Sequence, residues 1–379
     1  MYLLQTTMVL ALVAGGLGAA LTGSIKVPLA ARLRIDEARI GGLVSIFGFT
    51  LVPVIFTAGF LTDLVGRQAV LLGGSVLLAV SLALLARARN YGAALAAVIV
   101  LSAGWALVIN VGNVLTPLAF PGNLAYATNL ANVFFGLGAF LTPLATAMLI
   151  RRIAFAPALC VLGSLCLLPG VLALGIDLAA VLPAAGPSDM AAPTASGMFQ
   201  DPFLWLCGLM LFFYGPLEAS VGAWATTYLG EQGYREQTAS GLLSAFWLTF
   251  MAARLTTAFC LPASWESLLI LVLSLACVGV LCGMVLGRGR AVGAATIIAA
   301  GAVFGPIFPT LVAVFLGHFP PALHGRAVGM LFAIGGIGWA LIPILIGAAA
   351  RRRGVRRGFS VAIGAAVGLS AVALALFTR

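Results

Sequence analysis

The chain of 379 residues is 62% hydrophobic and only 8% charged, with a mean hydropathy of +1.16. A soluble chain has about 25% charged residues, so this composition excludes an ordinary soluble globular protein. The net charge of +10 comes from 20 basic residues, mostly arginines clustered at the ends of apolar blocks, which indicates anchoring to lipid headgroups rather than binding of nucleic acid.

Long apolar blocks follow one another along the whole chain, and each is long enough to span a bilayer as a helix. We expect twelve transmembrane helices, at 7–30, 39–62, 68–86, 91–115, 123–150, 153–183, 202–229, 237–261, 265–287, 291–317, 324–350 and 356–377. The start MYLLQTT has no basic residue, so the first block is predicted to be a retained span and not a cleaved signal. The predicted fold class is therefore an all-α, multi-pass integral membrane protein.

The longest break, AAGPSDMAAPTASGMFQD at 184–201, falls between the sixth and seventh blocks and is rich in Pro, Ser, Ala and Gly. It has the composition of a linker. We therefore predict an N-terminal six-helix half at 1–183, a central linker loop at 184–201 and a C-terminal six-helix half at 202–379.

The fifth and eleventh blocks repeat each other at an offset of 200 residues. The matched pairs are Gly136 and Gly336, Gly138 and Gly338, Leu141 and Leu341, Pro143 and Pro343, and the double arginines Arg151–Arg152 and Arg351–Arg352. Glycines allow close helix contacts and prolines bend helices. The match predicts two pseudo-repeated six-helix bundles, a known transporter architecture.

The sharpest local motif is GFLTDLVGRQ at 59–68, between the second and third blocks. Gly59 permits close helix contact, Asp63 can face a helix N-terminus, and Arg67 can pair with Asp63. The motif, with Gly66 before Arg67, resembles the loop signature of the major facilitator superfamily. That resemblance implies a cytoplasmic latch that holds one conformation. The corresponding site in the second half, FMAARLTT, keeps Arg254 but has no Asp, so the second latch is incomplete.

Further stretches resemble the fucose-permease-like sugar porter group of that superfamily. They are AGWALVINVGN, NLANVFFGLGAFLTPL, the spacing of Tyr214, Glu218 and Gly222, and FGPIFPTL with Pro306 and Pro309. Proton-coupled members of the group carry an Asp in the first helix and a Glu in the fourth. Ser24 and Ile109 stand at those positions here. Either the chain uses Glu218 for coupling, or it is a facilitator without proton coupling.

Glu218 lies near the middle of its block, where an ionised side chain costs about 2.5 kcal/mol or more. Such a residue is a proton carrier or a substrate contact, or else a structural Glu that is hydrogen-bonded to neighbouring helices. Lys26 is the other charged candidate inside a block. It either snorkels to the interface or contacts Glu218 across a cavity.

The uncharged polar and aromatic residues of the spans give a candidate solute-binding set. Its members are Asn110, Asn113, Asn129, Asn132, Tyr214, Trp224, Thr227 and Trp339. Asn110 and Asn113 lie three residues apart, as do Asn129 and Asn132, so each pair shares a helix face. The alternative for each asparagine is an interhelical hydrogen bond, and for each aromatic residue a lipid-facing or interfacial position.

The chain shows no enzyme constellation, and no cofactor or metal is predicted. His318 and His324 lie in HFPPALHGR without an acidic neighbour, so we expect them to be solvated loop residues. The six cysteines lie in apolar blocks without a C-x-x-C pair, which is typical of packing residues. There is no Gly-x-x-x-x-Gly-Lys sequence, so ATP drive is not supported.

The orientation implied by the superfamily, with both termini in the cytoplasm, places most of the arginine clusters in outward loops. That opposes the positive-inside rule. We favour the family orientation, because the Asp63 loop defines it through the resemblance, and expect a monomer in a bacterial inner membrane.

The predicted function is secondary active or facilitative transport of a small, sugar-like polar solute by alternating access, with possible proton coupling at Glu218 (a symporter). The alternatives are an exporter of amphipathic or drug-like compounds, and a non-transporting sensor or assembly protein on a degenerate porter fold. The substrate, the transport direction and the coupling ion stay open.

Overall fold

The structure, a computed structural model, describes residues 1–177 and 195–379 of the chain. These residues are 89% helical and contain no strand. Most of the predicted linker at 184–201 lies outside the described residues, and its last part includes the short helix α9 (Ala195–Phe199).

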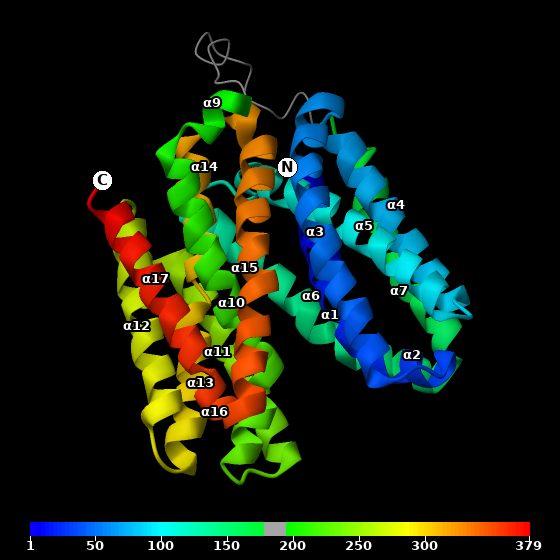
Figure 1. Cartoon of the computed structure of the whole chain (residues 1–379). Coiled ribbons are helices and arrows are strands. Elements are labelled where there is room, and N and C mark those ends of the chain that lie inside the picture. Colours follow the sequence, from blue (N-terminus) through cyan, green and yellow to red (C-terminus); the bar gives the residue numbers. More distant parts are fainter. Residues whose placement is uncertain (178–194) are drawn as a thin grey trace. The chain divides into compact units, whose positions relative to one another are not determined.

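Most helices begin and end close to the predicted blocks (Figure 1). The sixth block was predicted to reach residue 183, but its helix ends at Ala173. In the first part they are α1 (Tyr2–Ser24), α2 (Lys26–Leu33), α3 (Glu37–Val65), α4 (Arg67–Arg87), α5 (Tyr91–Ala119), α6 (Leu124–Ile153) and α7 (Phe155–Ala173). The later ones are α10 (Pro202–Glu231), α11 (Glu236–Cys260), α12 (Glu266–Leu286), α13 (Arg290–Phe304), α14 (Ile307–His318), η2 (Pro321–Leu323), α15 (His324–Arg353), α16 (Val355–Gly358) and α17 (Ser360–Phe377).

Among the described residues, twelve helical spans are long and apolar enough to cross a membrane. The tenth span, Arg290–His318, contains both α13 and α14. The first predicted block, 7–30, is wrong at both ends, because α1 runs from Tyr2 to Ser24 and the chain then starts the separate short helix α2. Lys26 is therefore the first residue of α2 and lies outside the first span.

The described chain forms two compact units. Unit 1 comprises Met1–Gly122, Ala131–Ala195 and Phe319–Ala333, and unit 2 comprises Asn123–Leu130, Ser196–His318 and Ile334–Arg379. Two of the membrane spans, α6 and α15, are each divided between the units. These are the fifth and eleventh spans, the pair that repeats in the sequence.

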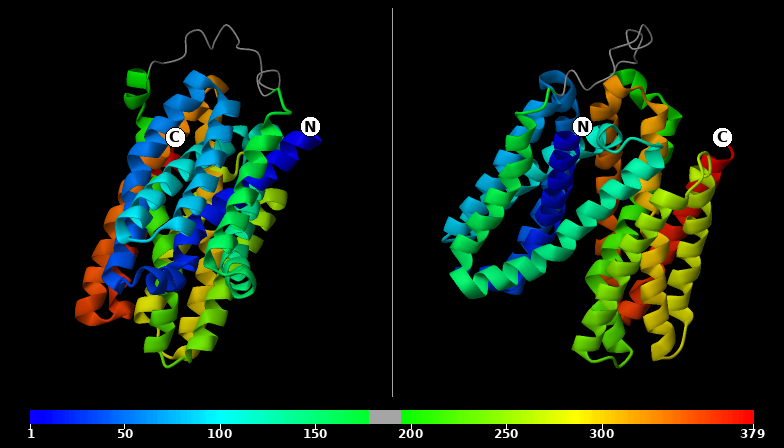
Figure 2. Two further views of the ribbon diagram at one scale, coloured as in Figure 1. Left: turned by 90° about the vertical axis from the view of Figure 1, so that its right-hand side faces the viewer. Right: turned by 180° about the vertical axis from the view of Figure 1, so that it is seen from behind.

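In unit 1, α4 packs against both α5 and α7, and α5 also packs against α1 and α3 (Figure 1, Figure 2). Small residues make the tightest of these contacts. A side chain at Gly104 would meet the α4 backbone at Gly74 and Leu78, and a side chain at Gly163 would meet Ala79. Glycine at these positions lets the helix backbones approach closely.

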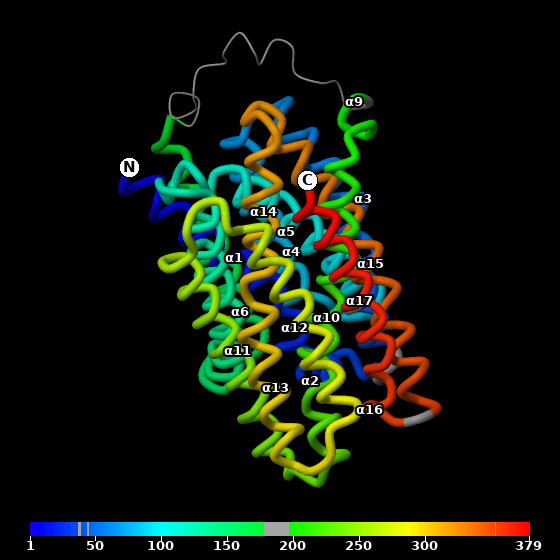
Figure 3. The backbone as a smooth tube through the Cα atoms, turned by 90° about the vertical axis from the view of Figure 1, so that its left-hand side faces the viewer, coloured from blue at the N-terminus to red at the C-terminus, as the bar shows by residue number. Residues whose placement is uncertain are grey.

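In unit 2, α11 packs against α13, while α17 packs against both α12 and α10. Figure 3 shows α12, in yellow, running beside α17, in red. Aromatic side chains fill this core, and Phe246, Phe250 and Phe304 are among its largest fully buried residues.

The predicted repeat is visible in equivalent glycine contacts. In unit 1, a side chain at Gly138 of α6 would collide with the backbone of Val13 in α1. In unit 2, a side chain at Gly338 of α15 would collide with the backbone of Phe212 in α10. The fifth span thus packs on the first as the eleventh packs on the seventh. Each of the two helices also carries an internal proline, Pro143 or Pro343.

Candidate functional site

Glu218 lies within α10, the seventh span, and is partly buried. One helical turn before it, Tyr214 is 1% exposed. The Tyr214 hydroxyl lies 3.0 Å from Oε2 of Glu218 and 2.8 Å from the carbonyl oxygen of Phe304, to which it can donate. The carboxylate therefore contacts a buried phenol that also reaches the end of α13.

Arg254 of α11 is the positive charge beside this pair. It is 3% exposed, its Nε donates to the Gly305 carbonyl at 2.8 Å, and its guanidinium lies 4.1 Å from the centroid of the Phe250 ring. Its charge acts on both Glu218 and Tyr214. The sequence assigned Arg254 to an incomplete latch, whereas the structure places it in the interior of unit 2 as a countercharge for Glu218.

The carbonyls that Tyr214 and Arg254 contact lie at the break between α13 and α14. Pro306 and Pro309 interrupt the backbone hydrogen bonding of this tenth span, because proline has no N–H group. The α13 helix ends at Phe304, and α14 begins at Ile307. The break therefore exposes carbonyls that side chains must satisfy.

Trp339 of α15 lies against α10 next to Tyr214. Its indole fills the space that a side chain at Gly215 would occupy, and it is partly buried. The other two candidates on α10 lie farther along the helix. Trp224 is partly buried and close to Gly347, and Thr227 is not covered by protein. The structure brings Tyr214, Glu218 and Trp339 together but does not add Thr227 to them.

Asn110 and Asn113 of α5 are both buried in unit 1. Asn110 accepts a hydrogen bond from Thr62 at 2.8 Å and donates to the Gly325 carbonyl at 3.0 Å. Asn113 donates to the Ile109 carbonyl of its own helix at 2.8 Å. Asn110 therefore makes the interhelical hydrogen bonds that were the alternative to solute binding. The amide of Asn113 bonds within its own helix.

Asn129 and Asn132 of α6 are also buried. In unit 2, the Asn129 amide donates to the Ala125 carbonyl at 3.0 Å and to the Thr310 hydroxyl at 3.1 Å. Its amide oxygen is buried without a hydrogen-bond partner. Asn129 therefore keeps an acceptor available for a hydroxyl donor.

The predicted latch residues of the first half lie together in unit 1, with a partner that the motif did not indicate. Asp63 accepts hydrogen bonds from the backbone N–H of Arg326 at 3.1 Å and from its Nε at 2.8 Å. Arg326 lies in the first turn of α15, so Asp63 faces a helix N-terminus, where a negative charge is favourable. Arg67 donates to the Pro321 carbonyl at 2.9 Å.

Glycines bring the two helices of the latch together. A side chain at Gly59 would meet the α15 backbone at Gly325, Arg326 and Gly329. Gly66 ends α3 with φ +90°, a conformation that favours glycine. The close contact of α3 with α15 explains why Asp63 pairs with an arginine more than 250 residues away along the chain.

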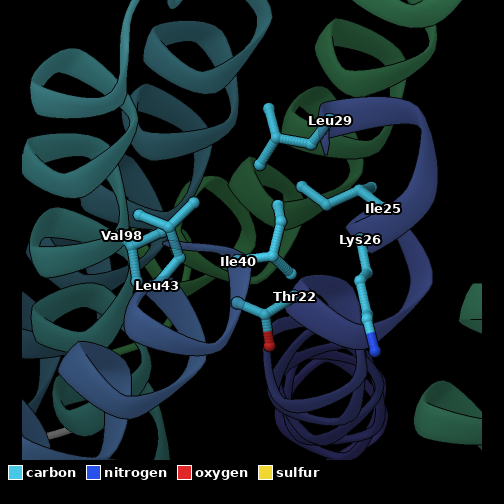
Figure 4. Close-up of a pocket in the computed structure, with 7 residues that line it drawn as sticks. All are labelled: Thr22, Ile25, Lys26, Leu29, Ile40, Leu43 and Val98. Atoms are coloured by element: carbon cyan, nitrogen blue, oxygen red, sulfur yellow. The ribbon is translucent and has the colours of Figure 1, made fainter. Parts of the chain in front are cut away.

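Lys26 lines a small hollow in unit 1 with Thr22, Ile25, Leu29, Ile40, Leu43 and Val98. Figure 4 shows its side chain extended along the end of α1, with Nζ directed away from Leu29. Lys26 is exposed, which agrees with snorkelling to an interface. Its contact with Glu218, a residue of unit 2, stays a prediction.

The two histidines lie at helix ends and not in a loop, and they differ in burial, because His318 is exposed as expected whereas His324 is buried. His318 ends α14 and pairs with Asp201 at 2.8 Å, while its ring stacks on Phe203. His324 begins α15, is 8% exposed and bonds to the Phe319 carbonyl at 2.9 Å. The described residues contain no group of three His, Cys, Asp or Glu side chains that could hold a metal ion.

Sequence reasoning missed three parts of these sites. They are Phe250 under Arg254, Thr62 beside Asn110 and Arg326 opposite Asp63. Thr62 and Arg326 lie in other helices from their partners, whereas Phe250 lies one turn before Arg254 in α11. The four-residue spacing of Phe250 and Arg254 was a sequence signal for their contact, and the closely spaced Pro306 and Pro309 were one for the break of the tenth span.

The chain resembles several known proteins. Residues 7–343 match the family model of the Major Facilitator Superfamily. "Bypass of stop codon protein 6" of Saccharomyces cerevisiae is 29% identical over 180 residues, which are 45% of this chain and 36% of that protein. The chain therefore aligns with about a third of the yeast protein.

Two similar solved structures are of FucP. The structure of FucP in the outward conformation matches this chain with a TM-score of 0.78 at 15% sequence identity, and the match covers 97% of each chain. A variant of the E. coli fucose:proton symporter FucP has a TM-score of 0.79 at 16% identity and covers 98% of this chain and 97% of its own. At these identities the likeness shows the fold.

The human organic anion transporter MFSD10 has a TM-score of 0.76 at 18% identity and covers 98% of this chain and 99% of its own. Three findings agree with this family. The described residues form twelve spans in two pseudo-repeated bundles, the loop with Asp63 contacts the eleventh span, and residues 7–343 match the family model. The chain belongs to the Major Facilitator Superfamily.

Proposed function

We propose that the chain is a secondary transporter of a small polar solute, coupled to protons through Glu218. The observation that carries this proposal is a partly buried carboxylate that contacts a buried tyrosine and interacts electrostatically with a buried arginine inside unit 2. Inside a membrane, such an ionisable group is costly and marks an ion or substrate path. Alternating access then exposes it to each side in turn.

The solute class that we propose is sugar-like. The amide oxygen of Asn129, the indole of Trp339 and the Tyr214–Glu218 pair offer acceptors and an aromatic face for hydroxyl-bearing molecules. The similar structure of a fucose:proton symporter supports the same class. Asn110 and Asn113 belong to this proposal less directly, because their amides already bond within unit 1.

Uptake into proteoliposomes tests the proposal. A panel of labelled sugars, polyols and sugar acids is offered with and without an inward proton gradient. We expect at least one solute to accumulate only with the gradient, and Glu218→Gln to abolish that accumulation. Glu236→Gln is the matched control, because Glu236 is exposed at the start of α11. Accumulation by Glu218→Gln with an unchanged pH profile would contradict coupling through this residue.

An export function for amphipathic compounds has one observation in its favour. Unit 1 carries a groove of about 580 Å³ lined by the apolar side chains Val54, Phe56, Ala58, Phe60, Leu61, Leu64 and Leu107, with Thr57. The similar structure of a human organic anion transporter points the same way. A thermal-shift screen separates the classes, since a bound substrate stabilises its transporter. Stabilisation by lipophilic ions and not by sugars would favour export. If neither class of compound stabilises the protein, a non-transporting role is favoured.

We also propose that the Asp63–Arg326 pair is the latch that holds one conformation, with Gly59, Gly66 and Arg67 shaping its loop. We also propose that the chain is a monomer in a bacterial inner membrane. The yeast relative makes a eukaryotic membrane the alternative.

A further inference from the structure

The tenth span is broken, and the break leaves backbone carbonyls without their usual helix donors. In a continuous helix, the Gly305 carbonyl would accept from residue 309, but Pro309 has no N–H group. Phe304 is the last residue of α13, so its carbonyl is also at a helix end. Inside a membrane such carbonyls must find other partners, because no water is present to satisfy them.

Two side chains from other helices satisfy these carbonyls. Tyr214 donates to Phe304 at 2.8 Å, and Arg254 donates to Gly305 at 2.8 Å. Both side chains also interact with Glu218, Tyr214 through its hydroxyl at 3.0 Å and Arg254 through its charge. One carboxylate therefore competes with the broken helix for both donors.

Because Tyr214 has a single hydroxyl proton to donate, this competition depends on whether Glu218 is protonated or ionised. A tyrosine hydroxyl carries a single proton, and the Phe304 carbonyl can only accept. If Tyr214 donates to Phe304, its contact with Glu218 is a hydrogen bond only when the Glu218 carboxyl is protonated and donates to the phenol oxygen. If Glu218 is ionised, it draws the tyrosine proton toward itself and the Phe304 carbonyl loses its donor.

We propose that Tyr214 and Arg254 are positioning residues through which protonation of Glu218 closes the α13–α14 break and ionisation of Glu218 loosens it. This inference rests on the proposed proton coupling and states what the proton does inside unit 2. The protonated carboxyl leaves Tyr214 and Arg254 to the two carbonyls. The ionised carboxylate attracts both donors, and the helix ends are freed to change their angle.

The other titratable groups near the cluster are few. Cys277 of α12 acts on Tyr214. Besides Arg254, the charged or titratable residues on the elements packed against α10 lie on α11, the tenth span, α15 and α16, while α17 has none. In unit 2 they include Glu236 and Cys260 of α11, Arg290 and His318 of the tenth span, Arg351 and Arg352 of α15, and Arg356 and Arg357 of α16. These residues stand at helix ends, so Glu218 and Cys277 are the groups to separate experimentally.

Unit 2 offers a matched control on the same helix. Tyr228 of α10 is 1% exposed and donates to the Met284 carbonyl near the end of α12 at 3.0 Å. Tyr228→Phe removes a buried tyrosine-to-carbonyl hydrogen bond that lies away from Glu218. It therefore reports the structural cost of such a bond without the proposed switch.

Hydrogen exchange of the segment around 302–310 tests the proposal on the full chain in nanodiscs, without solute. After correction for the intrinsic pH dependence, we expect exchange there to be roughly fivefold to tenfold faster at high pH than at low pH, as loss of a hydrogen bond implies. Glu218→Gln should keep the slow, low-pH pattern at every pH. Tyr214→Phe should exchange fast at every pH, whereas Tyr228→Phe and Cys277→Ala should keep the pH response.

A pH-independent rate in the wild type, or a Tyr214→Phe protein that retains the wild-type response, would overturn the switch. If Cys277→Ala loses the pH response and Glu218→Gln retains it, the response belongs to the Cys277 thiol. That result would also overturn the proposed switch. The uptake assay is read separately. A switch that responds to Glu218 in a protein without proton-driven uptake supports this inference and contradicts the proposed function.

Discussion

At the residue scale, the central feature is that Glu218 has a countercharge. An ionised carboxylate alone inside a membrane would be strongly unfavourable, but Arg254 from α11 lies in the same core and acts on it. Arg254 in turn stacks on Phe250 and donates to Gly305. The three helices α10, α11 and α13 are thus linked through a few polar groups.

Removing Arg254 should expose this dependence. Arg254→Gln is expected to lower the free energy of unfolding by about 3–5 kcal/mol, because it leaves a charge without its partner. The double variant Arg254→Gln/Glu218→Gln should recover a large part of that loss, which thermal unfolding in detergent would measure. If the double variant shows the sum of the single effects, the two residues are not coupled.

The latch makes a second prediction at this scale. Asp63→Asn removes the charge that accepts two hydrogen bonds from Arg326, and it should destabilise the protein by about 1–3 kcal/mol. Arg326→Ala should add little to the loss in Asp63→Asn, because both changes break the same pair. Fully additive losses in thermal unfolding would contradict the ion pair.

At the element scale, glycines determine how closely the helices approach. The fifth span packs on the first through Gly138, and the eleventh on the seventh through Gly338, with the partner backbones in contact. The sequence predicted this repeat from Gly136, Gly138 and Pro143 and their counterparts, because glycine and proline act locally and leave a pattern.

Alanine at these contacts should therefore be costly. Gly138→Ala and Gly338→Ala are each expected to destabilise the protein by about 1–3 kcal/mol, because the added methyl group meets backbone atoms that cannot move aside. Gly364→Ala in α17 is the control, since a side chain there would meet nothing within 4 Å. Equal melting temperatures for all three variants would contradict the close packing.

The partners of polar residues were predicted less well than the helices, for a physical reason. Twelve spans follow from runs of apolar residues, which are a local property of the chain. Arg254 was assigned to a latch because its local stretch corresponds to the first-half motif. Its electrostatic interaction with Glu218 and its hydrogen bond to Gly305 depend on three helices packing together. The same holds for Arg326, whose carboxylate partner lies in α3.

At the scale of the whole molecule, the open question is which way the spans cross the membrane. The Asp63 loop implies cytoplasmic termini, whereas the arginine clusters oppose that orientation under the positive-inside rule. Asn90 precedes α5, and Ser264 precedes α12. Counting spans from the N-terminus places these two loops on opposite sides of the membrane.

Single-cysteine labelling decides between the orientations. In a background without other cysteines, we expect Asn90→Cys to react with an impermeant maleimide from outside intact cells. Ser264→Cys should react only after permeabilisation. The reverse pattern would show that the arginine-rich loops face the cytoplasm, and the family orientation would be wrong.

The most direct test of the central claim follows protons and solute together. Proteoliposomes loaded with a pH-sensitive dye are given a downhill gradient of the solute that the uptake panel identifies. The account predicts that solute entry acidifies the lumen in the wild type. In Glu218→Gln it predicts that solute exchange continues without acidification. Solute entry into wild-type vesicles without any proton movement, or acidification that persists in Glu218→Gln, would contradict proton coupling through Glu218.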